Sequence, residues 1–293
     1  MANITAKLVK ELRDRTGVGM MDAKKALVEV DGDMDAAIDF LRTKGLATAA
    51  KKADRIAAEG LAAAYVAGNT AAIVEVNSET DFVAKNEQFQ TLVKSVVKAV
   101  AENKPANMEE ALEIEVDGVK LADAMTEATT KIGEKIDFRR FEILEKTDAD
   151  VFGTYVHAGG SIVAVVKVTD STDEDAARDV AMHVAAINPQ FATREDVSED
   201  VYNREKEVQT EKTLAEGKPE HIVEKIVEGR MGKFYSEIVL AEQPFVKDGD
   251  VTVAQFIESK GGKVDSFVRF EVGEGIEKRQ DNFAEEVAAQ MKQ

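Results

Sequence analysis

Apolar residues in the first part of the chain recur at the spacing of one helix face, and capping residues bound each run. Thr5 can cap a first helix and Asp33 a later one. Glycines separate the helices before Asp33, and Gly45 predicts the end of the last helix. Residues 1–55 are therefore predicted to form a three-helix bundle, and an Ala- and Lys-rich stretch links it to the rest of the chain.

Beyond residue 60 the pattern changes to two strands around a turn, followed by a helix and a closing strand. The stretch "GLAAAYVAGNTAAIVEVN" predicts a hairpin with a Gly-Asn turn, and Asn86 can cap the helix after it. A second hairpin, helix and strand follow, with Thr172 as the predicted helix cap. Both closing strands, at 138–143 and 267–272, share the pattern Phe-x-Arg-Phe-Glu. This order predicts an α+β fold with a duplicated core, made of two lobes with antiparallel sheets.

The second repeat contains an insertion at about residues 197–230 with few apolar positions. Ser198 can cap its first helix, Gly217 can end that helix, and Pro219 suits the start of the next one. Two helices with so narrow an apolar seam predict an antiparallel coiled-coil hairpin that projects from the core.

The patterns divide the chain into four predicted parts. These are a helical domain at 1–55, a core N-terminal subdomain at 56–147, a core C-terminal subdomain at 148–275 that contains the inserted hairpin, and a C-terminal helical module at 276–293.

The formal net charge of −18 changes the range of expected partners. An acidic chain repels phosphate backbones, so direct binding of nucleic acid is not expected. The absence of cysteine excludes disulfides and thiolate metal sites, and it is compatible with a reducing compartment. The chain begins without the apolar stretch of a secretory signal, and its longest apolar runs are too short to span a bilayer. A cytoplasmic protein without a membrane partner is the expectation.

The common sequence motifs for phosphate binding and nucleophilic catalysis are absent from the chain. The chain contains no phosphate-binding Gly-x-x-x-x-Gly-Lys loop and no Gly-x-Ser-x-Gly nucleophile motif. Its three histidines lack the spacing of metal ligands, and His183, inside a predicted helix, favours a structural role. The expectation is therefore a protein without a cofactor, a metal or an enzymatic activity.

Two stretches of the chain resemble the signature segments of bacterial elongation factor Ts. They are "LVKELRDRTGVGMMDAKKAL" at 8–27 and "EVNSETDFVAKN" at 75–86. The resemblance extends over the whole chain and includes the late "RFEVGEGIEK". It implies a guanine-nucleotide exchange factor that binds elongation factor Tu, GDP-bound or nucleotide-free, and promotes GDP release without covalent chemistry. It also implies that the N-terminal bundle is similar to a ubiquitin-associated (UBA) domain. Ala23 departs from the family, where many members have Cys, but a thiol has no part in exchange.

The resemblance implies the site residues as well. A segment made of Thr80, Asp81, Phe82 and Val83 would displace Mg²⁺ from the nucleotide site of Tu, with Phe82 inserting between Tu side chains. Further contacts with Tu are implied for Met20, Lys24, Ile132, Gly133 and His157. A homodimer or a 2:2 complex with Tu is compatible with this implication.

Other interpretations stay open from the residues alone. Phe82 lies seven positions before Phe89 and could share its apolar stripe, so periodicity favours a core position, whereas the motif favours exposure. Packing inside the bundle is expected for at least one of Met20 and Met21. A binding module confined to residues 1–55 is a second hypothesis, and it predicts that Phe82→Ala has no effect. An α+β enzyme with an unrecognised site is a third, and it requires turnover of a small molecule.

Overall fold

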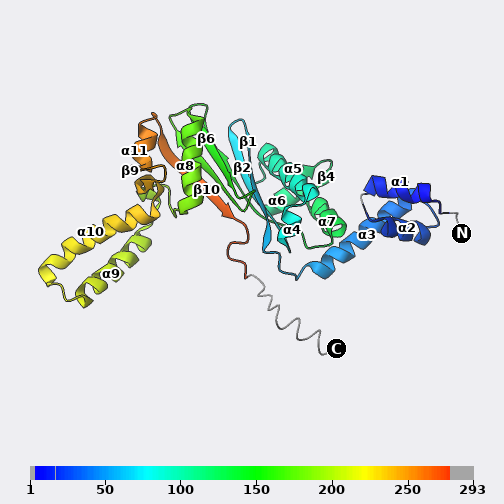
Figure 1. Cartoon of the computed structure of the whole chain (residues 1–293), viewed down its shortest axis with the longest axis horizontal. Helices are drawn as coiled ribbons and strands as arrows, with labels where there is room; N and C mark the ends of the chain where they lie inside the picture. The colour runs from blue at the N-terminus through cyan, green and yellow to red at the C-terminus, as the bar shows by residue number, and fades with distance from the viewer. Residues whose placement is uncertain (1–3, 17, 278–293) are drawn as a thin grey trace. The chain divides into compact units, whose positions relative to one another are not determined.

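The computed structural model describes residues 4–16 and 18–277, which form helices and antiparallel sheets (Figure 1). The predicted α+β class is confirmed. The chain divides into two compact units. The first comprises Met1–Leu61, Val74–Arg140 and Val272–Gln293, and the second comprises Ala62–Ile73 and Phe141–Glu271. The helix predicted within 276–293 lies outside the described residues.

The first unit begins with three packed helices, α1 (Ala6–Thr16), α2 (Met20–Glu29) and α3 (Met34–Lys52). The buried apolar residues of these helices and of the link between α1 and α2 form one core: Val9, Leu12, Val18, Ala23, Ala26, Leu27, Ala37 and Leu41. The side chains of Thr5 and Asp33 accept backbone hydrogen bonds at the starts of α1 and α3, as predicted. The prediction that Gly45 ends the third helix is wrong. Gly45 is buried inside α3 facing α7, where a Cβ would lie 3.0 Å from Thr130 Oγ1, so its small size permits the close approach of these helices.

The same unit contains a second group of short elements around the long helix α5. These are α4 (Asp81–Ala84), α5 (Glu87–Asn103), α6 (Met108–Glu113), β3 (Glu115–Val116), β4 (Val119–Lys120) and α7 (Leu121–Ile132). Asn86 caps α5 as predicted, since its Oδ1 accepts the Gln88 N–H at 2.8 Å. Phe89, Val93, Val96 and Val100 form the buried face of α5. This face is apolar at helical spacing, which explains why the sequence pattern located the helix.

Two three-stranded sheets repeat one order of elements. In the first sheet, β1 (Glu59–Ala67), β2 (Thr70–Ser78) and β5 (Asp137–Glu145) are ordered β1-β2-β5. In the second, β6 (Val151–His157), β7 (Ile162–Thr169) and β10 (Lys263–Glu271) are ordered β10-β7-β6, and both neighbours run antiparallel to β7. In each case the closing strand pairs with the second strand of the preceding hairpin, so the two sheets share the order of elements that the duplicated sequence pattern predicts.

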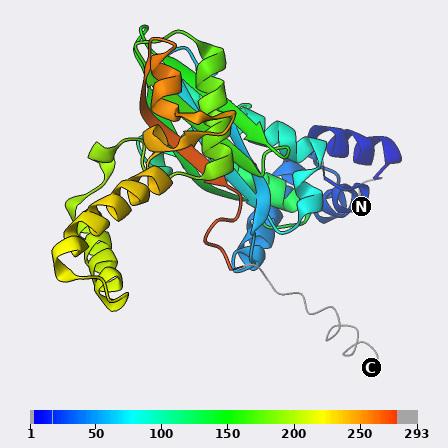
Figure 2. The same ribbon diagram turned by 60° about the vertical axis from the view of Figure 1, so that its left-hand side comes forward.

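Helix α8 (Glu174–Ile187) packs on the second sheet, as both views show (Figures 1 and 2). Its apolar face and the inner face of β7 are built from Ala and Val, small side chains that bring the helix close to the strands. The predicted cap, Thr172, is wrong by one residue. The carboxylate of Asp173 accepts the Ala176 N–H at 2.9 Å and takes that position.

Gly153 of β6 allows this sheet to lie close to α8. A Cβ at this position would lie 2.0 Å from the carbonyl oxygen of Ala177, which is a backbone atom that no side-chain rotation can move. By contrast, Gly229 lies in a helix, and a Cβ there would meet nothing within 4 Å.

Alanine at these two glycines is expected to have opposite effects on stability. Gly153→Ala should lower the free energy of unfolding by about 3 kcal/mol, because backbone must move to admit the methyl group. Gly229→Ala should raise it by about 0.5–1 kcal/mol through helix propensity. Urea unfolding followed by circular dichroism measures both. A loss of stability in Gly229→Ala, or none in Gly153→Ala, would contradict the packing described.

The insertion in the second unit is a helical hairpin of α9 (Glu199–Ala215) and α10 (Glu220–Ile238), which run side by side (Figures 1 and 2). Ser198 caps α9 as predicted. The helices share a narrow apolar seam of Val223, Val227 and Met231, packed against Tyr202 and Phe234. Near the turn, Arg230 donates to Thr213 Oγ1 at 3.0 Å and to the carboxylate of Glu216.

The two ends of the hairpin meet at its base. Phe191 N donates to Ile238 O at 3.1 Å, and Leu240 N donates to Phe191 O at 2.8 Å. Arg194 pairs with Glu242 and lies over the ring of Tyr235, 4.3 Å from its centroid. Beyond the base, the unit continues through β8 (Pro244–Phe245), β9 (Asp248–Thr252) and α11 (Val253–Glu258) before β10.

His183 is a buried structural residue, as its place in a helix predicts. Its Nε2 lies 2.9 Å from Gln243 Oε1, and its Nδ1 accepts the Val246 N–H at 3.1 Å. Burial lowers the pKa of His183, and the hydrogen bond with Gln243 only partly opposes this. The ring therefore joins α8 to the segment around β8 in its neutral form.

Across the described residues, every helix is either too short or too polar to cross a bilayer.

Candidate functional site

Four of the predicted site residues lie where β2 turns into a short helix. Every residue of β2 is buried, and the strand ends at Ser78. Thr80 has extended backbone angles (φ −129°, ψ 155°) and directly precedes α4, which is a single turn. Asn86 then starts α5, so α4 is bounded by a buried strand on one side and by a long packed helix on the other.

Phe82 projects into solvent from α4. Its side chain is 80% exposed, whereas the adjacent Val83 is only 8% exposed. Successive helix positions point about 100° apart, so Val83 enters the core while Phe82 faces away from it. Phe82 therefore does not belong to the core stripe of Phe89, and the position favoured by periodicity alone is wrong because that stripe begins only with α5.

Asp81 and Lys85 form an ion pair beside the ring. Lys85 Nζ lies 2.6 Å from Asp81 Oδ2 and 5.9 Å from the centroid of Phe82. The hydrogen bond from Lys85 lowers the pKa of Asp81 below its usual value. The exposed aromatic ring is thus flanked by one negative and one positive group, both accessible to solvent.

Glu134 is a site residue that sequence reasoning missed. Its Oε2 accepts the N–H groups of Glu79 at 3.1 Å and of Thr80 at 3.0 Å, and its Oε1 accepts the Thr80 hydroxyl at 2.7 Å. Glu134 is 54 residues from Thr80 along the chain. No local pattern signals such a pairing, and the only hint was its place beside the predicted contact residues Ile132 and Gly133.

Glu134 brings two of the predicted segments together. Gly133 ends α7 in the left-handed conformation (φ 85°), which favours glycine, and the chain then turns to present Glu134 to Thr80. Ile132 is half-buried and Gly133 is exposed. The start of α4 and the end of α7 therefore lie side by side within the first unit, with both predicted contact segments at the surface.

The remaining predicted residues lie elsewhere. Met20 and Lys24 are exposed on α2. The expected packing of Met20 or Met21 is wrong, since they are 46% and 65% exposed and the buried face of α2 consists of Ala23, Ala26 and Leu27. His157 belongs to the second unit, where it ends β6, is exposed, and stacks on Tyr155 with ring centroids 6.3 Å apart.

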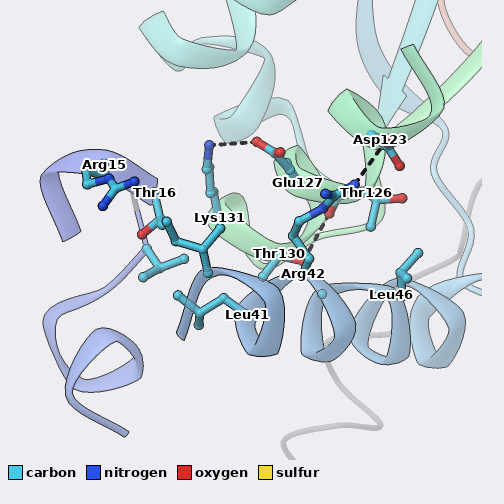
Figure 3. A pocket seen from close by; sticks show the side chains of 13 residues that line it. Arg15, Thr16, Leu41, Arg42, Leu46, Asp123, Thr126, Glu127, Thr130 and Lys131 are labelled. Carbon is cyan, nitrogen blue, oxygen red and sulfur yellow. Dashed lines mark hydrogen bonds and ion pairs between the residues drawn. The ribbon is translucent and has the colours of Figure 1, made fainter. Parts of the chain in front are cut away.

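A cavity of about 290 Å³ opens between α3 and α7 (Figure 3). Its lining includes the apolar Leu41 and the charged Arg42 and Asp123, and these two charged groups lie 3.7 Å apart. None of the predicted contact residues lines it. Within residues 4–16 and 18–277, no cluster of three histidine, aspartate or glutamate side chains is arranged to hold a metal ion.

Comparisons with known proteins identify the class. A sequence model of the family described as Elongation factor TS matches residues 79–274. Proteins named Elongation factor Ts from Limosilactobacillus reuteri strain DSM 20016 and from L. reuteri subsp. reuteri strain JCM 1112 are each 60% identical over 291 residues, covering 99% of this chain and 100% of theirs. The chain is therefore a translation elongation factor. It belongs to the elongation factor Ts family, as its two signature segments predict.

Proposed function

We propose that this chain binds elongation factor Tu and promotes the release of GDP, so that GTP can take its place. The observation that carries the proposal is the exposure of Phe82 on a helix whose base is held by Glu134 and Val83. An exposed phenylalanine gains roughly 1.5–3 kcal/mol when it enters an apolar pocket, so a ring held in solvent favours a partner that supplies one. Membership of the elongation factor Ts family supports Tu as that partner.

The proposed mechanism acts on the metal of the partner. Mg²⁺ bridges nucleotide phosphates and requires nearly ideal octahedral geometry. A ring inserted beside the site shifts the surrounding groups and weakens metal binding, and Phe82 can do so at low entropic cost because it has few rotatable bonds. Thr80 and Val83 hold the ring, and Asp81 adds a negative charge that disfavours nearby phosphate. No covalent bond is made or broken.

Thermodynamic linkage determines what the protein can do to the nucleotide. A factor that binds nucleotide-free Tu more tightly than GDP-bound Tu weakens nucleotide binding by the same ratio. It need not distinguish GDP from GTP, because the nucleotide concentrations in the cytoplasm set the direction of exchange. The net charge of −18 supports a protein partner over direct contact with nucleic acid.

Other parts of the molecule extend the proposed interface. The helices α1–α3 would act as a UBA-like module that contacts Tu through Met20 and Lys24. Ile132 and Gly133 would touch Tu beside Phe82, and His157 would add a contact from the second unit. The hairpin of α9 and α10 would be a coiled coil. The whole protein would form a homodimer or a 2:2 complex with Tu. Sedimentation with Tu distinguishes these assemblies from a 1:1 complex.

Release of a fluorescent GDP analogue tests the function. Purified Tu is loaded with the analogue and chased with excess GTP, with and without this protein. We expect faster release in its presence, and we expect added Mg²⁺ to slow that release because it restores the displaced ion. If folded Tu shows no acceleration, the proposal is rejected. If release is faster but insensitive to Mg²⁺, only the displacement mechanism is rejected.

A further inference from the structure

Two carboxylates connect the segment before α4 to the segment after α7, and each accepts at least one backbone N–H group from the other segment. Glu134 accepts the N–H groups of Glu79 and Thr80, while Glu79 Oε1 accepts the Lys135 N–H at 2.6 Å. We call this reciprocal arrangement the Glu79–Glu134 pair. Hydrogen bonds to a charged acceptor are stronger than neutral ones, so the two turns that carry these residues are held at a fixed separation.

A third segment joins the Glu79–Glu134 pair. Arg55 lies 3.2 Å from Glu79 Oε2, and Lys135 Nζ donates to Ala53 O at 2.7 Å. These two contacts come from Ala53 and Arg55, which follow the end of α3. The segment that connects α3 to β1 therefore also contacts the Glu79–Glu134 pair and Lys135. Three segments of the first unit, far apart in the sequence, therefore meet beneath α4.

The length of α4 makes this support necessary. A helix of one turn has almost no hydrogen bonds of its own and is not stable in isolation. The direction of Phe82 must then come from the attachments of α4, which include Val83 in the core, Asn86 at the start of α5, and Thr80 on Glu134. Of these three, the third holds Thr80, the residue directly before the turn, through both its N–H and its hydroxyl.

We propose that Glu134 is a positioning residue for nucleotide exchange, because its carboxylate fixes the direction in which Phe82 meets the partner. The proposal rests on the proposed function and deepens it. Glu134 acts through Thr80 and Phe82 and touches neither nucleotide nor metal. Its loss should therefore lower the maximum rate of GDP release more than the apparent affinity for Tu, since positioning matters most in the transition state.

A double-mutant cycle tests this role, with Glu134→Ala, Phe82→Ala and the double variant in the fluorescent GDP release assay. We expect losses in the maximum rate of about tenfold for Glu134→Ala and about 30-fold for Phe82→Ala. The double variant should lose about 30-fold, not about 300-fold, because Glu134 has nothing to direct once the ring is gone. Glu134→Gln keeps an oxygen that can accept both N–H groups and should retain most of the rate.

Glu127→Ala is the matched control, because Glu127 lies on α7 and pairs with Lys131, four residues further along the same helix, at 3.1 Å. We expect it to exchange like the wild type. Thermal unfolding of each variant checks that a lower rate does not come from unfolded protein. If Glu134→Ala exchanges normally while Phe82→Ala does not, the positioning role is overturned and the proposed function stands. Additive losses in the double variant also overturn it. A silent Phe82→Ala would instead reject the role of the ring itself.

Discussion

Phe82→Ala should reduce the proposed stimulation of GDP release by about 30-fold and leave the stability of this protein unchanged. Insertion of the ring into Tu is proposed to contribute about 2 kcal/mol, in the middle of the range for burying a phenylalanine, and 1.4 kcal/mol corresponds to a factor of ten. The ring is 80% exposed in the free protein, so its removal costs the fold almost no buried surface. This separation of activity from stability makes the result interpretable.

Stopped-flow release of the fluorescent GDP analogue measures the loss, and thermal unfolding measures the stability. Val246→Ala is a suitable control, because Val246 is another exposed apolar residue, at 45%, and has no proposed contact with Tu. It should exchange normally. Phe82→Leu keeps an apolar side chain without the ring and should fall between the wild type and alanine. Wild-type exchange by Phe82→Ala would show that the ring does not act on Tu.

Glu75→Ala should lower the free energy of unfolding by about 3 kcal/mol, because it removes one side of a buried ion-pair network. Glu75 is fully buried in β2. Its carboxylate receives Arg139 at 2.9 Å, Arg140 at 2.6 Å and the Gly273 N–H at 2.8 Å. Removing it takes away the shared acceptor of two guanidinium groups and leaves the Gly273 donor unsatisfied. Breaking a buried pair from one side is costly for this reason.

The contribution of Glu75 should also depend on pH. Burial raises its pKa, but the hydrogen bonds from Gly273, Arg139 and Arg140 outweigh burial and lower the pKa below the usual glutamate value. As the pH falls below 4.5, the unfolded chain binds a proton at Glu75 before the folded chain does. The stabilisation is therefore complete above this pH and is lost as the pH falls through the lower pKa of the folded state.

Urea unfolding of the wild type and Glu75→Ala at several pH values measures this difference. The gap between the two proteins should be widest near neutral pH and should narrow in acid. Glu142→Ala is the matched control, since Glu142 is exposed on the neighbouring strand β5, and it should change stability by less than about 0.5 kcal/mol. Equal effects at positions 75 and 142 would contradict the energetic importance of the buried ion pairs.

Much of the fold was predictable because its signals are local. Asn86 and Ser198 indicate helix starts because their side chains can accept backbone N–H groups. The shared Phe-x-Arg-Phe-Glu pattern of two strands indicates the duplication. The helix end predicted at Gly45 is wrong because a glycine that ends a helix cannot be told in sequence from one that lets two helices approach. The difference lies in α7, more than seventy residues away along the chain.

The candidate site was predictable only in part. The motif located Phe82 where periodicity favoured the core, because a single exposed ring before a helix leaves no periodic signal. Glu134 could not be found in the same way. Its hydrogen bonds to Glu79 and Thr80 depend on where α7 ends in space, and the chain has 56 acidic residues from which to choose. Patterns identify elements, whereas pairings between distant turns require the tertiary structure.

The joined ends of the α9–α10 hairpin have a consequence for how this protein can change over evolution. Phe191, Ile238 and Leu240 close the base with backbone hydrogen bonds at the outer ends of the hairpin, where Ile238 is the last residue of α10. Adding or deleting matched turns in both helices leaves these bonds in place. The length of the hairpin can thus increase or decrease, through natural selection or protein engineering, while the fold of the rest of the second unit stays the same.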